Sequence, residues 1–171
     1  STDPIQKTLA LGALNAIGHF ILHKCGYQLD YTTDSMALFN PQPGDVMGMV
    51  GYFPPLVRRI REANIPLTVI ELKEELITRE PGFVVTTDAR ELGRCTKVLC
   101  TSTVLLNDSL DDILQNCRQA DRVAIIGPTA GFLPDPLFER GVDTIGGTFI
   151  EDVGAFLEHC HKQEEWGPAA R

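Results

Sequence analysis

The sequence predicts an α/β fold, an open and mostly parallel Rossmann-like sheet with helices on both faces. Short, continuous apolar runs alternate with helical segments along most of the chain, which is typical of parallel strands buried on both faces. The strand predicted over Asp45–Gly51 leads directly into a helix that begins at Pro54–Pro55, where proline is tolerated because the first helical N–H has no intrahelical partner. The 171 residues, 43% of them hydrophobic, suffice for one ordinary core.

Residues 1–26 are predicted to form one apolar N-terminal helix. It spans Pro4–Lys24, with Asp3 as the N-cap and Gly26 just past its end. Its apolar residues cover more than the single stripe that a surface helix needs, so we expect a second domain or another copy of the chain to cover it. The apolar run is too short and too interrupted to span a bilayer, and no signal-peptide cleavage site follows it.

Residues 27–43 are predicted to be an irregular loop. No helical or alternating period is present there, and turn residues follow at Asn40–Gly44. A loop of this length in a compact domain is usually functional or docked on a neighbour. The Rossmann-like core then covers residues 44–163 and forms one domain with the N-terminal helix, and residues 164–171 form a tail.

Within the core, the pattern alternates between strands and helices. Strands are predicted over Asp45–Gly51, Ile65–Leu72, Phe83–Thr86, Lys97–Thr101, Arg122–Gly127 and Val142–Gly147. Helices are predicted over Pro54–Asn64, from Asp88 through Leu92 with Gly93 past the end, over Ser109–Gln119, near Asp135–Arg140 and over Glu151–Gln163. Residues 73–83 are predicted to be a charged loop.

Charge and cysteine content exclude several classes of partner. The 23 acidic and 15 basic residues give a net charge of −8, and the basic residues form no large cluster. This argues against nucleic acid or an anionic membrane as the main partner. The five cysteines are odd in number and widely spaced, so we expect reduced thiols in a cytoplasmic protein rather than disulfides.

The predicted ligand site is the edge of the sheet where the carboxyl ends of the parallel strands meet. Four of the five strand ends considered carry Gly or Thr, whose backbones can approach a ligand and whose hydroxyls can bind it. Glu71 is the exception: an acid about 20 positions after Gly51 resembles the residue that binds ribose hydroxyls in dinucleotide-binding folds. Gly48–Gly51 is not the full G-x-G-x-x-G fingerprint, so the glycines could instead serve only tight turns.

Four sequence motifs follow one another along the chain and cover about Leu9 to Leu157. They are LGALNAIGHF, GDVMGMVGYFPPLVRRIRE, TSTVLLNDSLDDILQNC and VAIIGPTAGFLPDPLFERGVDTIGGT. On these motifs the chain resembles the putative heavy-metal-chelation family of largely uncharacterised bacterial and archaeal proteins. The resemblance implies a Rossmann-like domain that, in typical members, follows a smaller domain similar to the N-terminal part of enolases. It also implies a ligand site in the cleft between the two domains. Because the sequence starts at the Leu9–Phe20 motif, we expect the smaller domain to be absent here.

The family motifs imply the same ligand-binding residues as the strand ends: Gly51, Tyr52, Phe53, Glu71, Thr101, Ser102, Thr103, Asn107, Gly127, Pro128, Thr129, Gly147 and Thr148. Asn107 either turns its amide into the crevice or closes the turn before Ser109. Glu71 is a candidate acid or base if it is buried without a partner, and has no special role if it is exposed.

A transition metal is a candidate cofactor beside a nucleotide-like ligand, and the candidate metal ligands are His19, His23 and Cys25. The two histidines lie four residues apart on the first helix and share a face, with Cys25 just beyond. Residues 159–161 form a second His-Cys-His cluster, but consecutive helical side chains point about 100° apart and cannot all reach one ion. Histidines near a helix C-terminus are also favoured without a metal.

Three functions remain open from the sequence. We favour a binding protein that holds a small polar or anionic molecule, or a metal complex of one, in the crevice. The second is an enzyme with Glu71 as acid or base and a nucleotide-like cofactor, although the chain has no G-x-S-x-G elbow, phosphate loop or H-E-x-x-H motif. The third is an accessory subunit that docks through the first helix. We expect a homo-oligomer or a partner that covers this helix.

Overall fold

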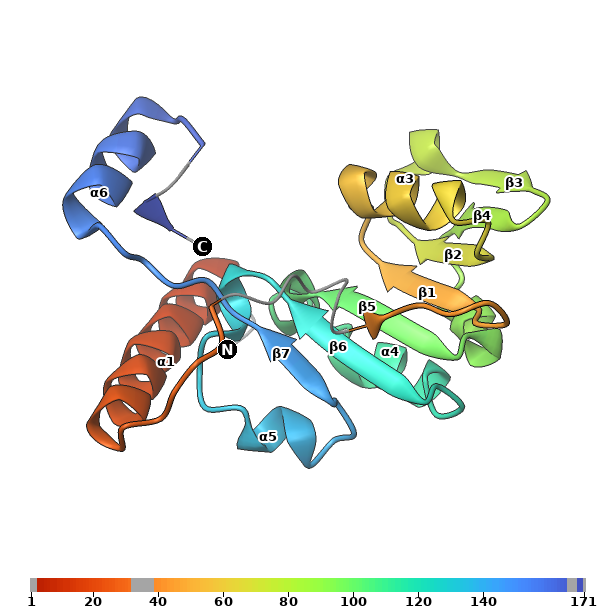
Figure 1. Ribbon diagram of the computed structural model, residues 1–171. Helices are drawn as coiled ribbons and strands as arrows, with labels where there is room; N and C mark the ends of the chain where they lie inside the picture. The colour runs from red at the N-terminus through yellow and green to blue at the C-terminus, as the bar shows by residue number, and fades with distance from the viewer. Residues whose placement is uncertain (1–2, 32–38, 166–168, 171) are drawn as a thin grey trace.

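The computed structural model describes residues 3–31, 39–165 and 169–170 (Figure 1). Residues 32–38 of the predicted loop, and 166–168 and 171 of the predicted tail, lie outside the described residues. The strands are β1 (Met47–Val50), β2 (Leu67–Ile70), β3 (Thr78–Glu80), β4 (Phe83–Thr86), β5 (Lys97–Thr101), β6 (Arg122–Ile126) and β7 (Thr144–Gly146). The α-helices are α1 (Pro4–Lys24), α3 (Pro54–Glu62), α4 (Leu110–Asn116), α5 (Asp135–Phe138) and α6 (Val153–Lys162). Short 3₁₀ helices cover Glu74–Leu76, Ala89–Arg94, Ser102–Leu105 and Pro128–Ala130.

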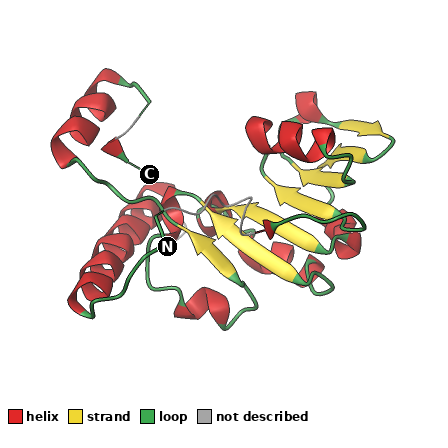
Figure 2. Cartoon of the chain, in the orientation of Figure 1, coloured by secondary structure: helices red, strands yellow, loops and turns green. Residues whose placement is uncertain are grey.

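The strands form one sheet that is parallel except at one edge. Its order is β3-β4-β2-β1-β5-β6-β7, and among the described strands β3 alone runs antiparallel to its neighbour. Numbered along the chain, the parallel strands follow the order 3-2-1-4-5-6, which is that of dinucleotide-binding Rossmann sheets. The predicted open, mostly parallel α/β fold is confirmed (Figure 2).

Helices cover the two faces of the sheet unequally. On one face α3 packs Val57 and Ile60 into a core cluster with Met49 of β1. On the opposite face α4 packs Ile113 into a second cluster with Ile125 of β6. Neither α1 nor α6 contributes a buried residue to either cluster, and both lie at the β7 side of the molecule (Figure 1).

The helix α1 has the predicted bounds but packs little of its surface. The Asp3 carboxylate accepts the N–H of Ile5 at 3.0 Å, as an N-cap does, and Gly26 follows the helix at φ +67°. Apolar side chains on its outer side stay exposed, with Ile5 71%, Leu9 68% and Phe20 60% accessible. No helix in the described ranges is both long and apolar enough to cross a membrane.

The segment predicted as a charged loop, residues 73–83, contains the short strand β3. It pairs with β4 through Thr78 opposite Val85 and Glu80 opposite Phe83. The sequence pattern did not reveal this strand, because its three residues are polar and only partly buried or exposed. An edge strand that carries charge is protected from pairing with other chains.

Two helical segments are shorter or tighter than predicted. The turn after Asp88 is a 3₁₀ helix that continues to Arg94, so Gly93 lies inside it rather than past its end. Asp88 caps it by accepting the N–H of Arg90 at 3.0 Å. Ser109 precedes α4 but makes no side-chain cap bond, and the helix ends at Asn116.

The last helix, α6, stands away from the sheet (Figure 1). None of its residues is buried, and Val153 and Leu157 are 62% and 50% exposed. The described part of the tail folds back to the segment before the helix: the N–H of Glu151 donates to the carbonyl of Ala169 at 2.9 Å, and Ile150 forms an antiparallel bridge with Ala170.

Candidate functional site

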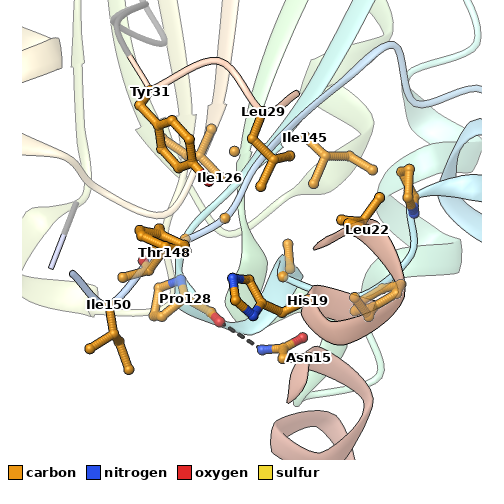
Figure 3. Close-up of a pocket in the computed structure, with 18 of the residues that line it drawn as sticks. Asn15, His19, Leu22, Leu29, Tyr31, Ile126, Pro128, Ile145, Thr148 and Ile150 are labelled. Carbon is orange, nitrogen blue, oxygen red and sulfur yellow. Dashed lines mark hydrogen bonds between the residues drawn. The ribbon is translucent and has the colours of Figure 1, made fainter. Parts of the chain in front are cut away.

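A cleft of about 1190 Å³ lies beside α1, around the carboxyl ends of β6 and β7 (Figure 3). Its lining comes from α1, from residues 27–31, from β6 with the turn that follows it, and from β7 with residues 147–156. These segments are far apart in the sequence. Open α/β sheets bind ligands outside the carboxyl ends of their strands, most often where the strand order reverses. The cleft lies at the carboxyl edge, next to β6 and β7, whereas the strand order reverses between β1 and β5.

The cleft depends on a close contact between α1 and the turn after β6. A Cβ atom on Gly18 would lie 2.9 Å from backbone atoms of residues 132–133, so only glycine allows the helix this close. One turn earlier, Asn15 Nδ2 donates to the carbonyl oxygen of Pro128 at 2.9 Å (Figure 3). Because of these contacts, one side of α1 forms a wall of the cleft.

Aromatic side chains from separate segments meet in the cleft. The ring of Phe149 lies 5.2 Å from that of His19 on α1 and 5.0 Å from that of Tyr31, centroid to centroid. Both pairs are tilted, at 43° and 58°, a geometry in which aromatic rings attract one another. Tyr27 and Phe156 also line the cleft. The wall is therefore mainly a hydrophobic and aromatic surface.

Few polar groups interrupt this surface. The Oδ1 atom of Asn15 is buried and has no hydrogen-bond partner within the described chain, although its Nδ2 is bound to Pro128. The described lining contains one carboxylate, that of Asp30, and the imidazole of His19, but no lysine or arginine. An unpaired buried acceptor costs about 1–3 kcal/mol, and this one has almost no surface that a molecule in the cleft could contact.

Some of the predicted site residues line this cleft and others do not. Those in the lining are His19, Gly127, Pro128, Gly147 and Thr148. Residues that the sequence did not single out complete it, among them Asn15, Tyr27, Leu29, Tyr31, Ile126, Phe149 and Ile150. Two signals pointed toward them: the first helix is more apolar than a surface helix needs to be, and the long loop after it carries aromatic residues.

The carboxylate of Glu71 contacts backbone amides at the ends of two neighbouring strands. Its Oε2 accepts the N–H of Tyr52 at 3.0 Å, and its Oε1 accepts those of Leu72 and Lys73 at 2.8 and 3.1 Å. It thereby holds the turn Gly51–Phe53 against the end of β2. The acid or base role of Glu71 stays a prediction, and the geometry shows a carboxylate that is already hydrogen-bonded to the chain.

The predicted hydroxyl groups at the ends of β5 and β6 bind one another. Thr101 and Thr103 share a hydrogen bond of 3.0 Å between their Oγ1 atoms. Ser102 Oγ donates to Thr129 Oγ1 at 3.1 Å and accepts the N–H of Thr129 at 3.2 Å. Gly127 has φ +132°, and a Cβ there would lie 2.5 Å from Ser102 Oγ. These residues join the ends of two strands next to the cleft.

Asn107 closes a turn. Its Oδ1 accepts the N–H of Ser109 at 3.2 Å and the Ser109 hydroxyl at 2.7 Å, and its side chain is exposed. Of the two roles open from the sequence, the structure shows the turn.

The candidate metal ligands do not converge. In the part of the chain that the structure describes, no group of three or more His, Cys, Asp and Glu side chains is arranged to hold a metal ion. His19 contributes its ring to the aromatic cluster with Phe149, whereas His23 and Cys25 are exposed and do not line the cleft.

The thiols in the core are unsuited to act as nucleophiles. Burial raises the pKa of Cys95 to about 11 and that of Cys117 to about 12, and raises the pKa of the fully buried Cys100 well above its usual value. A thiol needs its thiolate form to react, so these three residues stay protonated and inert at neutral pH. Cys25 and Cys160 are exposed, and all five cysteines are free.

A second, smaller cleft of about 360 Å³ lies at the other end of the sheet, over the Ala89–Arg94 turn. Its charges compensate one another: Arg90 binds Asp88, and Glu91 pairs with Arg94 and Arg79 at 3.0 and 2.9 Å. The hydrogen bond from Arg90 lowers the pKa of Asp88 to about 2. With its charges paired internally, this cleft offers less to a ligand than the one beside α1.

Comparison with known proteins gives one consistent result. A sequence profile of the family DUF364, described as "Putative heavy-metal chelation", matches residues 34–164. The uncharacterized protein MJ0500 of Methanocaldococcus jannaschii is 27% identical over 161 residues, which are 92% of this chain and 60% of that protein. The chain thus spans about 60% of the length of this curated relative.

Two crystal structures of DUF364 proteins of unknown function have a similar fold. The protein from Pyrococcus horikoshii aligns with a TM-score of 0.79 at 20% identity, over 98% of this chain and 67% of that one. The protein from Desulfitobacterium hafniense DCB-2 aligns with a TM-score of 0.75 at 21% identity, over 100% of this chain and 68% of that one. At these identities the likeness concerns the fold.

Proposed function

The chain belongs to the DUF364 family, and on this premise we propose that it is a binding protein that holds a small organic molecule, or a metal complex of one, in the cleft beside α1. The observation that carries the proposal is the cleft itself. It combines a largely apolar wall, a few polar groups and a place at the carboxyl ends of parallel strands, as ligand sites in α/β proteins do.

The description of the family suggests a heavy metal, and the described residues do not fit a metal ion held by the protein alone. Soft transition metals prefer several thiolate or imidazole ligands, and no such set of three is assembled in the described ranges. His19 is the one imidazole in the lining. A metal complex in this cleft would therefore bring most of its donor atoms with its organic part.

The first test is native mass spectrometry of the purified chain under conditions that retain ligands, together with elemental analysis. We expect an additional organic mass, with or without a stoichiometric metal, on the wild-type chain. A tryptophan in place of Ala16, which lines the cleft, should displace it. The matched control is Ala13→Trp, an exposed position on the same helix outside the lining, which should retain the mass.

Two results would contradict the proposal. One is an additional mass that Ala16→Trp and Ala13→Trp retain equally, because the molecule would then bind elsewhere. The other is a wild-type chain that carries no ligand and binds none of the small molecules offered to it, as judged by chemical-shift changes at cleft residues.

A further inference from the structure

We propose that the cleft selects a flat aromatic ring that carries no negative charge. The inference rests on the proposed binding function and names the chemical class of the ligand. Two independent features of the lining support it: its aromatic content and its charge.

The aromatic content is unusually concentrated. The chain has eight Phe and three Tyr, and six of these eleven residues line this one cleft: Tyr27, Tyr31, Phe132, Phe138, Phe149 and Phe156. Three separate segments contribute rings that contact one another: α1 contributes His19, the segment after α1 contributes Tyr31, and the segment after β7 contributes Phe149. The centroid of the Phe149 ring lies 5.2 Å from that of His19 and 5.0 Å from that of Tyr31. Tyr31 is 42% exposed, so a bound ring can reach this residue.

The charge of the lining excludes strongly anionic ligands. A phosphate or carboxylate loses water on entering an apolar cleft and needs a cation or several N–H donors in return. The described lining has no lysine or arginine to pair with such a group. The chain as a whole carries −8. Among the small polar or anionic ligands that the sequence suggested, the lining favours neutral ones, and it also suits cations because aromatic faces attract them.

The test uses three matched compounds: β-naphthol, its saturated decahydro derivative and β-naphthoate. The first is flat and neutral, the second is neutral but not flat, and the third is flat but anionic. Binding to an isotope-labelled chain is followed by amide chemical shifts and by titration calorimetry. We expect β-naphthol to shift cleft residues and to bind about tenfold more tightly than the decahydro compound, since stacking on an aromatic side chain contributes about 1–3 kcal/mol. It should also bind more tightly than β-naphthoate, whose carboxylate loses water on entering the cleft without gaining a cation.

Substitutions locate the effect. His19→Leu should remove most of the preference for the flat compound, whereas His23→Leu, one turn further along the same helix and outside the lining, should leave it unchanged. Phe149→Leu should act like His19→Leu, and a thermal melt of each variant shows that it is folded.

The outcomes separate this inference from the proposed function. If the decahydro compound or β-naphthoate binds the cleft as tightly as β-naphthol, the aromatic or the charge selectivity is wrong and the binding function stands. If His19→Leu and His23→Leu have the same effect, the ring cluster is not the selecting element. If none of the three compounds shifts cleft residues and no retained ligand is found, the proposed function fails and this inference fails with it.

Discussion

At the scale of single residues, the carboxylate of Glu71 is hydrogen-bonded to backbone groups of the chain. Its two oxygens accept N–H groups from Tyr52, Leu72 and Lys73. We expect Glu71→Ala to lower the free energy of unfolding by about 1–3 kcal/mol, because backbone donors are left without an acceptor. Urea denaturation measures this. The control is Glu74→Ala, an exposed residue of the next turn, which should change stability by less than about 0.5 kcal/mol. Equal effects of the two substitutions on stability would contradict the role of Glu71 as an acceptor for these backbone N–H groups.

At the scale of elements, Asp45 ties the segment that enters β1 to the segment that enters β5. Its Oδ2 pairs with Lys97 Nζ at 2.7 Å and accepts the N–H of Gln42 at 2.7 Å, and its Oδ1 accepts the Thr96 hydroxyl at 3.0 Å. Burial raises the pKa of Asp45, but the hydrogen bonds from Lys97, Gln42 and Thr96 outweigh it, so the pKa lies below the ordinary value of 3.8.

A lowered pKa in the folded state makes this link dependent on pH in a defined direction. The stabilisation is fully present above the unfolded pKa and is lost as the pH falls through the folded one. We expect Asp45→Asn to lower the free energy of unfolding by about 1–2 kcal/mol at neutral pH. The difference from wild type should shrink as the pH falls below 3.8, in urea titrations at several pH values. A difference that does not change with pH would show that the charge of Asp45 is not what matters, and Asp121→Asn, at an exposed aspartate, serves as the control.

Elements with strong local signals could be predicted from the sequence. The helix α1 and the strands β4 and β5 have the predicted bounds, because caps mark the helix and short apolar or β-branched runs mark the strands. The strand β3 was missed because its pairing with β4, rather than any apolar pattern, makes it a strand.

The candidate site could be predicted only in part, because its walls are joined by long-range contacts. The strand ends at Gly127 and Gly147 follow from the strand pattern and do line the cleft. The contact of Gly18 with residues 132–133 connects segments more than a hundred residues apart. No local sequence pattern indicates which end of the sheet α1 lies against. Asn15, Tyr31 and Phe149 could therefore not be assigned to the site from the sequence.

At the scale of the whole molecule, the outer side of α1 is an apolar surface that the described chain leaves exposed. Ile5, Leu9, Ile17 and Phe20 are each more than half exposed, and they recur along one side of a helix of 21 residues. A contiguous apolar surface of this kind marks a contact site. We expect the purified chain to self-associate through it.

Sedimentation velocity over a range of concentrations tests this expectation. The double variant Leu9→Glu and Phe20→Glu should shift the wild-type oligomer toward monomer, because a charge on each of two central positions disfavours burial of the surface. Thr8→Glu, an exposed position on another side of the helix, should change the distribution much less. A wild-type chain that stays monomeric at all concentrations would count against self-association.

The close contact at Gly18 also bears on how a tilt of α1 would be distributed along the helix. Ile5 lies about 20 Å from Gly18 along the helix axis, since 13 residues separate them and each adds about 1.5 Å. A small tilt about the contact at Gly18 would hardly move the ring of the adjacent His19, whereas it would move the end at Ile5 much further. That end is held by the ion pair between Lys7 and Asp108, whose carboxylate is exposed and hence open to screening by salt. We therefore expect the loss of this ion pair at high salt to affect the far end of the helix more than the ring contact in the cleft.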